Sequence, residues 1–173
     1  MAVILVLGGA RSGKSGYAQR QAEQAAAASG RPPLLLATAQ PFDDEMRDRI
    51  HRHQIERGDG WRTREVPLDL AAALRELAAG DIAVVDCLTL WLSNQMLAEN
   101  DLAAAMDDLA RALADCSADV WVVSNEVGWS LVPDNPLGRR FRDEAGRLNQ
   151  KIAAVSDHAC LIVAGMKLEL QPC

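Results

Sequence analysis

The residues best suited to chemistry lie near the start of the chain, in the segment Gly8-Gly9-Ala10-Arg11-Ser12-Gly13-Lys14-Ser15. This segment fits the phosphate-binding P-loop pattern G-x-x-x-x-G-K-S/T at every fixed position. Its glycines let the backbone curl so that successive N–H groups point at phosphate oxygens. Lys14 would neutralise charge on the β- and γ-phosphates, and the Ser15 hydroxyl would help to coordinate Mg²⁺. A glycine-rich turn that contains a lysine by chance is the alternative. The sequence therefore predicts a nucleoside triphosphate site.

Two apolar segments further along end in polar side chains. The segment 82–86 ends in Asp86, and in a P-loop protein such a carboxylate holds Mg²⁺, directly or through water. Asp86 could instead cap the turn that follows it, but the P-loop upstream favours the metal. The segment 120–125 is followed by Glu126, so Asn125 and Glu126 lie where an open α/β sheet binds ligands. A polar loop without ligand is an equal alternative for this pair.

A highly charged segment at residues 43–57 predicts a helix, with aspartates at its start and Gly58 after its end. One stripe of this helix would carry Met46, Ile50, His53 and Arg57. We therefore expect His53 on the face that docks onto the domain, with arginines one turn to either side. It could act there as a nucleophile or as an acid–base group toward bound phosphates. The alternative is a half-buried histidine that packs the helix against the sheet.

Short apolar runs alternate with longer segments of helical spacing. Strands are expected over 2–7, 34–38, 62–66, 82–86, 120–125 and 159–163, and helices over 16–28, 68–79, 101–116 and 137–155. This rhythm is typical of a doubly wound α/β sheet, and strands without alternation indicate parallel strands covered on both faces. The segment 165–170 alternates, which predicts an antiparallel edge strand at the C-terminus. We expect a mostly parallel sheet flanked by helices.

Composition limits the possible partners. A chain of 173 residues that is 49% hydrophobic suits one domain, residues 1–173. The net charge of −6 disfavours binding to nucleic acid. The arginines between Arg139 and Arg147 belong to a charged helix that is a solvated face, a subunit interface or a pocket for a polar substrate. Four cysteines without C-x-x-C spacing, and no apolar stretch of bilayer length, indicate a cytoplasmic protein without membrane insertion.

In order and spacing, these segments resemble the bifunctional adenosylcobinamide kinase and adenosylcobinamide-phosphate guanylyltransferase family of cobalamin biosynthesis. The resemblance covers nearly the whole chain, and each segment beyond the P-loop is weak by itself. The matching segments are Gly8 to Ser15, Ala37 to Gln40, Asp44-Glu45-Met46 with Arg49, Ile50 and His53, Trp61-Arg62-Thr63 with Glu65, Asp86 to Thr89, Asn125 to Gly128, and Phe141-Arg142-Asp143 with Gly146, Asn149 and Gln150.

The resemblance implies two reactions at one site. A nucleoside triphosphate phosphorylates the aminopropanol hydroxyl of adenosylcobinamide. GMP then passes from GTP through a covalent guanylyl-histidine to adenosylcobinamide phosphate, giving adenosyl-GDP-cobinamide and pyrophosphate. GTP is thus a substrate, and ATP is a second candidate for the kinase step. The histidine at the matching position is His53, and His51 is the alternative if the register is shifted.

The resemblance also implies site residues, fold and assembly. His53 and Lys14 would be catalytic, and Ser15 and Asp86 would hold Mg²⁺. The nucleotide would contact Gly8, Gly9, Ala10, Arg11, Ser12, Gly13, Lys14, Ser15, Thr38, Ala39, Gln40, Gln54, Ile55, Glu56, Arg57, Glu65 and Asp86. The family fold resembles the recombinase-like branch of single-domain P-loop NTPases, and its members form homotrimers.

Two other functions fit the P-loop and Asp86. One is a P-loop small-molecule kinase without the covalent guanylyl step. The other is a nucleotide-dependent switch protein, although the N-K-x-D sequence typical of switch GTPases does not occur in the chain.

Overall fold

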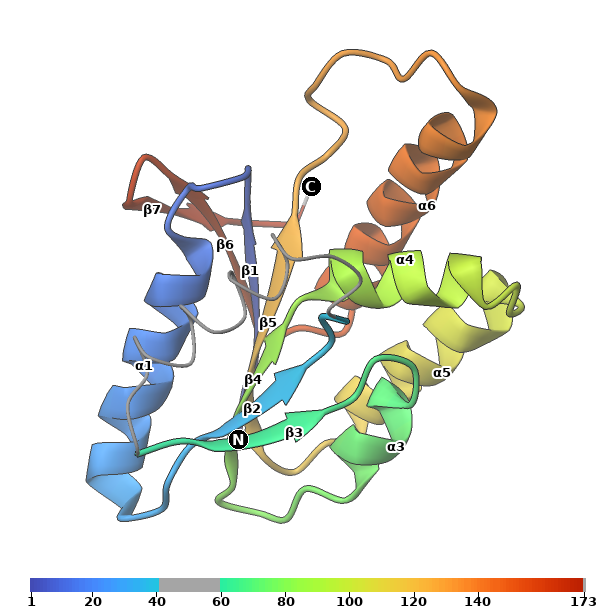
Figure 1. The fold of residues 1–173 in the computed structure, drawn as a ribbon. Coiled ribbons are helices and arrows are strands. Elements are labelled where there is room, and N and C mark those ends of the chain that lie inside the picture. The colour runs from blue at the N-terminus through green and yellow to red at the C-terminus, as the bar shows by residue number, and fades with distance from the viewer. Residues whose placement is uncertain (41–59, 173) are drawn as a thin grey trace.

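The computed structural model describes residues 1–40 and 60–172, and its described part is built around one sheet (Figure 1). The strand order is β3-β2-β4-β5-β1-β6-β7. The strands are β1 (Val3–Gly8), β2 (Leu34–Ala37), β3 (Arg62–Glu65), β4 (Ile82–Asp86), β5 (Asp119–Asn125), β6 (His158–Val163) and β7 (Met166–Leu170). Neighbours from β3 to β6 pair in parallel, and β7 pairs with β6 in antiparallel fashion. The mostly parallel sheet with an antiparallel C-terminal edge strand is thus confirmed.

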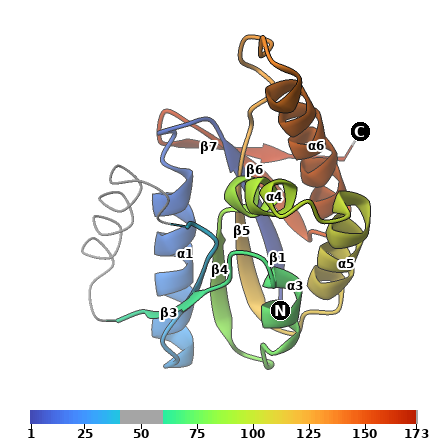
Figure 2. The ribbon, with the colours of Figure 1, turned by 45° about the vertical axis from the view of Figure 1, so that its right-hand side comes forward.

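Helices cover both faces of this sheet, as Figure 2 shows. On one face lies α1 (Lys14–Ser29), and on the other lie α3 (Leu70–Arg75), α4 (Leu88–Leu97), α5 (Leu102–Ala114) and α6 (Pro136–Ala153). The core is accordingly split into two apolar clusters, one on each face. The buried apolar side chains of α1 are the small Ala18 and Ala22, so this helix packs closely against the sheet that carries the P-loop.

The central strands are apolar because both of their faces are covered. In β4 the residues from Ile82 to Val85 are all buried, and in β5 the residues from Val120 to Ser124 are buried. A strand buried on both faces has no polar side to alternate with its apolar side. The edge strand β3, whose residues are all exposed, carries charged side chains instead. The predicted strands, exposed or buried, agree with the observed ones to within one residue at each end.

One helix prediction is wrong in length. The sequence predicts a helix over residues 68–79, but α3 ends at Arg75. The chain turns after this point because Gly80 adopts a left-handed φ of 82° and the Asp81 carboxylate accepts a hydrogen bond from the backbone N–H of Ala78 at 2.9 Å. The helix α4, by contrast, was not predicted from the sequence. Its N-cap position is Cys87 rather than Asp86, so the alternative of Asp86 as a cap residue is not supported.

The expected helix over 43–57 lies outside the described residues. Within residues 1–40 and 60–172, no helix has the length and apolar character needed to cross a membrane.

Candidate nucleotide-binding site

The P-loop joins the end of β1 to the start of α1. Gly13 occupies the N-cap position of α1 with φ 97°, and Lys14 is the first helical residue. Only glycine adopts this left-handed conformation without strain from a Cβ atom. The loop therefore leads directly into the positive end of a helix of 16 residues, which is the arrangement that favours an anion such as phosphate.

Gly8 is needed because neighbouring atoms fill the space of a side chain. A Cβ atom at Gly8 would lie 2.4 Å from Ser12 Oγ and 2.7 Å from the backbone oxygen of Ile162 in β6. The loop is also tied to its neighbours through the backbone. The N–H of Gly165, in the turn between β6 and β7, donates to Ser12 O at 2.9 Å, and the N–H of Glu126 donates to Gly8 O at 3.1 Å. Segments that follow β5 and β6 thus hold in place the loop that follows β1.

Replacing Gly8 by alanine is expected to lower both stability and nucleotide affinity. The added methyl group forces the backbone of the loop or of β6 to shift, and overpacking of this kind costs about 1–3 kcal/mol. Thermal unfolding and titration with GTP measure the two effects. Gly146 in α6 is the control, since a Cβ atom there meets nothing within 4 Å, and alanine at a helical position is stabilising by up to about 1 kcal/mol. Unchanged affinity in Gly8→Ala would contradict this account of the loop.

The side chain of Lys14 folds back over the loop. Its Nζ donates to the backbone oxygen of Gly9 at 3.0 Å, and the side chain is only 7% exposed. The ammonium group is thereby held against the segment whose backbone would surround the phosphates. A lysine in this position supplies a positive charge without having to be ordered when the ligand binds.

The end of β4 is fixed by Thr38, which follows β2. The Thr38 hydroxyl donates to Cys87 O at 2.7 Å and accepts from Cys87 N at 2.8 Å. Thr38 is fully buried, and its own backbone oxygen accepts from Asn94 Nδ2 of α4 at 2.8 Å. The hydroxyl of Thr38 therefore positions the peptide that directly follows Asp86. The sequence singled out Thr38 only through the family resemblance, and it gave no signal for Asn94.

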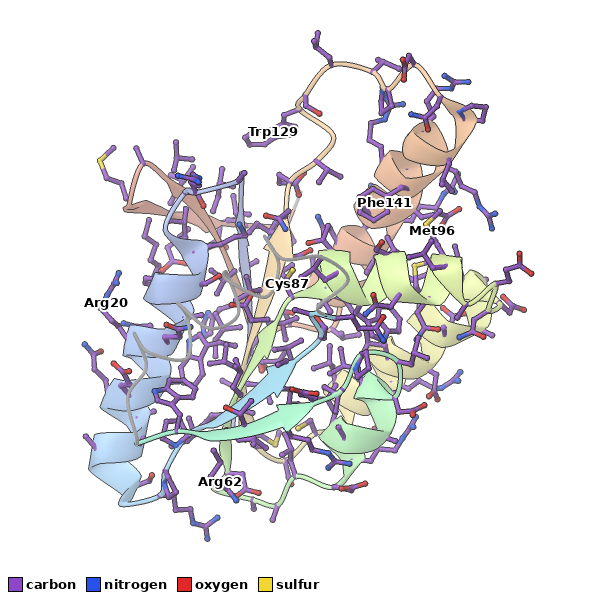
Figure 3. All side chains as sticks on the ribbon, viewed as in Figure 1. Arg20, Arg62, Cys87, Met96, Trp129 and Phe141 are labelled. Carbon is purple, nitrogen blue, oxygen red and sulfur yellow. The ribbon has the colours of Figure 1, made fainter. Side chains whose placement is uncertain are left out.

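The charges of Lys14 and Asp86 act on the same thiol. Burial raises the pKa of Cys87 above its ordinary value, and the Asp86 carboxylate raises it further, whereas hydrogen bonding to Thr89 and the charge of Lys14 lower it. Because β1 and β4 both pair in parallel with β5, the P-loop that follows β1 and the carboxylate of Asp86 lie at the same edge of the sheet (Figure 3 shows Cys87 where β4 meets α4). Cys87, Cys116 and Cys160 are buried and free.

The end of β5 carries a hydrogen-bonded network that reaches α6. Asn149 is buried, its Oδ1 accepts from Ser124 Oγ at 2.7 Å, and its Nδ2 donates to Asn125 O at 3.2 Å and to Glu126 Oε1 at 3.0 Å. Asn125 Nδ2 in turn donates to Thr89 Oγ1 at 2.7 Å. The sequence left Asn125 and Glu126 undecided between a polar loop and a ligand site. The structure shows both side chains engaged in specific contacts.

The remaining predicted contacts divide into two groups. Ala39 and Gln40 follow β2 and are half-buried, while Glu65 ends the edge strand β3, is exposed and lies in register with Ala37. The other group lies outside the described residues and consists of His53, Gln54, Ile55, Glu56 and Arg57, together with the alternative His51. The structure therefore brings the P-loop, the end of β2 and Asp86 to one edge of the sheet, and the histidine stays a prediction.

Comparison with known proteins agrees with this arrangement. The family model for cobinamide kinase / cobinamide phosphate guanyltransferase matches residues 4–170. The bifunctional adenosylcobalamin biosynthesis protein CobP of Pseudomonas aeruginosa is 45% identical over 96% of this chain and 96% of its own. The proteins named CobU of Salmonella typhimurium and Escherichia coli are 40% and 34% identical, each over 98% of this chain and 99% of their own.

A solved structure extends the comparison to the fold. It is an ATPase domain, and the match covers 92% of this chain and 68% of that domain's chain with a TM-score of 0.50 at 11% identity. This likeness supports the P-loop NTPase fold that the sequence predicted. The family is shown by the match of the family model over residues 4–170 and by relatives that are 34% to 45% identical over nearly their whole length: the chain belongs to the cobinamide kinase / cobinamide phosphate guanyltransferase family.

Proposed function

We propose that this protein phosphorylates adenosylcobinamide with a nucleoside triphosphate and then transfers GMP from GTP to adenosylcobinamide phosphate. The products are adenosyl-GDP-cobinamide and pyrophosphate. The observation that supports the proposal is the geometry of the P-loop in a chain that belongs to this family. The Lys14 ammonium donates a hydrogen bond to Gly9 O at 3.0 Å, and the side chain is buried against the loop. We further infer a homotrimer in the cytoplasm, without a nucleic-acid or membrane partner.

In both reactions the loop would bind the triphosphate. The backbone N–H groups from Gly8 to Ser15 and the positive end of α1 attract the phosphate oxygens, and Lys14 neutralises the charge that grows on them during transfer. The further contacts proposed for the nucleotide are Thr38, Ala39, Gln40, Gln54, Ile55, Glu56, Arg57, Glu65 and Asp86. Because Thr38 is fully buried and its hydroxyl donates a hydrogen bond to Cys87 O, its part in binding would be to fix the ends of β2 and β4.

Ser15 and Asp86 would hold Mg²⁺. Mg²⁺ prefers oxygen ligands and commonly takes one or two from the protein and the others from phosphates and water. A hydroxyl and a carboxylate at the same edge of the sheet fit that requirement. Among residues 1–40 and 60–172 no cluster of three or more His, Cys, Asp or Glu side chains could hold a metal ion. A Mg²⁺ site that takes its other ligands from the phosphates of the substrate and from water does not need such a cluster. When bound, the ion would supply positive charge to the phosphates.

The guanylyl transfer would use His53 as nucleophile, with His51 as the alternative. A neutral imidazole nitrogen attacks the α-phosphorus of GTP, a new N–P bond forms, and the bond to pyrophosphate breaks. The phosphate group of adenosylcobinamide phosphate then attacks the same phosphorus and releases the histidine. With an unperturbed pKa of about 6.5, a large part of the imidazole is neutral near pH 7.

The test is product analysis with purified protein, Mg²⁺, GTP and adenosylcobinamide. We expect adenosylcobinamide phosphate to appear first and adenosyl-GDP-cobinamide to follow, with one pyrophosphate released for each guanylyl group transferred. A phosphorylated product without any guanylyl product would instead identify a P-loop small-molecule kinase. GTP hydrolysis without any corrinoid product would identify a nucleotide-dependent switch protein. Repeating the first step with ATP decides which nucleotide serves as the phosphoryl donor.

A further inference from the structure

We propose that Glu126 accepts the proton of the substrate hydroxyl in the phosphorylation step, and that Asn149 is the positioning residue that holds its carboxylate. The inference rests on the proposed function above, because it assigns a role in the first of the two reactions.

The place of Glu126 in the fold supports this role. It directly follows β5, and the register pairs Asn125 with Gly8, the first residue of the P-loop. The backbone N–H of Glu126 donates to Gly8 O at 3.1 Å. The chain therefore leaves the sheet beside the loop that binds the triphosphate, at the edge where open α/β sheets bind their substrates.

The carboxylate of Glu126 is held by a buried amide. Asn149 is 6% exposed, and its three hydrogen bonds go to three consecutive residues: Ser124, Asn125 and Glu126. An amide whose oxygen and nitrogen are both engaged has a fixed orientation. Its Nδ2 donates to Oε1 of Glu126 at 3.0 Å. One carboxylate oxygen is thereby fixed in place by a neutral donor, which leaves the charge of the group intact.

Glu126 is not part of a structural ion pair in the part of the chain that the structure describes. Its side chain is half-buried, and carboxylates that leave water are ordinarily paired with a cation. By contrast, the carboxylates of Asp108 and Glu76 are exposed and pair with Arg75 and Arg64. A half-buried carboxylate that an amide holds beside a phosphate site is better explained by a catalytic role than by a contribution to the stability of the fold.

The two reactions differ in their need for a base. In phosphorylation the nucleophile is an alcohol, whose O–H bond must break as its oxygen bonds to the γ-phosphorus. The proton passes to Oε2 of Glu126, the bond between the γ-phosphorus and the bridging oxygen breaks, and the nucleoside diphosphate leaves. Carboxylates perform this task in protein kinases. In guanylyl transfer the nucleophile is a phosphate, whose second pKa is about 6, so it is largely ionised near pH 7 and needs no base.

The test is Glu126→Gln, assayed in the two steps separately. We expect phosphorylation of adenosylcobinamide to fall about 100-fold or more, the usual loss for a general base. Guanylyl transfer to supplied adenosylcobinamide phosphate should stay close to the wild-type rate. The control is Glu76→Gln, which makes the same change at an exposed carboxylate paired with Arg64 in the described structure. Glu76→Gln should carry out both the phosphorylation and the guanylyl transfer at the wild-type rate.

Asn149→Ala tests the positioning role. We expect kcat of the phosphorylation step to fall, with KM for GTP and the guanylyl step unchanged, and thermal unfolding measured in parallel reports any loss of stability. Equal losses in both steps for Glu126→Gln would overturn the inference, because a role in metal binding or in the fold would have this effect. So would full activity in both steps. Failure of the proposed function itself would appear in the wild-type protein, as the absence of adenosylcobinamide phosphate, and would remove the basis of the inference.

Discussion

Replacing Lys14 by alanine is expected to lower both the phosphorylation and the guanylyl transfer by about 100- to 1,000-fold. Both reactions build negative charge on phosphate oxygens, and the Lys14 ammonium is already held at the loop by its hydrogen bond to Gly9 O. Its removal takes away charge stabilisation that the transition states need and that water replaces poorly. The measurement is kcat/KM for each step, with adenosylcobinamide and adenosylcobinamide phosphate supplied separately.

Lys151→Ala is the matched control for this substitution. Lys151 lies on α6 and pairs with Asp107 of α5 at the surface, and such exposed ion pairs contribute little to stability. Both steps should therefore remain at the wild-type rate. If Lys14→Ala lost only one of the two reactions, the other would not use the P-loop, and the idea of one site for both reactions would have to be abandoned.

Replacing His53 by alanine is expected to abolish guanylyl transfer, with a loss of at least about 1,000-fold, since no covalent intermediate forms without its nucleophile. Phosphorylation of adenosylcobinamide should largely persist, because the γ-phosphoryl group passes directly to the alcohol. The measurement uses GTP labelled at the α-phosphate. After denaturation the wild-type chain should retain label in a bond that survives alkali and breaks in acid, as phosphoramidates do, and His53→Ala should retain none.

His51→Ala separates the two candidate histidines. It should keep the label if His53 is the nucleophile and lose it if the register of the resemblance is shifted. GTP labelled at the γ-phosphate is the second control, since it should leave no label on any of these chains. A His53→Ala protein that made adenosyl-GDP-cobinamide at the wild-type rate would refute the covalent assignment.

The order of elements could be read from the sequence because the central strands are buried on both faces. Runs such as 82–86 contain no polar residue before their last position, and a strand with both faces covered has this pattern. The end of α3 could not be read in the same way. Residues 76–79 have helical propensity, and the turn there depends on Gly80 and on the contact of Asp81 with the Ala78 backbone. Propensity alone does not report such a contact.

The P-loop could be predicted because its chemistry depends on neighbours in sequence. The residues that position the site depend on neighbours in space. The Thr38 hydroxyl forms hydrogen bonds with the backbone of Cys87, the residue after Asp86. The side chain of Asn149 forms hydrogen bonds with three consecutive residues at and just after the end of β5. An asparagine on a charged helix or a threonine after a strand gives no sign of its partner before the chain is folded. The family resemblance implies that Thr38 contacts the nucleotide. The structure shows that its hydroxyl holds the backbone of Cys87 in place.

The strand order has a consequence for how the protein is made. The strand that carries the P-loop, β1, is synthesised before both of its neighbours in the sheet, β5 and β6. The turn that braces the loop through Gly165 emerges later still. A nascent chain must therefore keep the apolar strand β1 without its partners until β5 and β6 have also been synthesised. The P-loop is thus encoded before the strands and the turn that hold it in place.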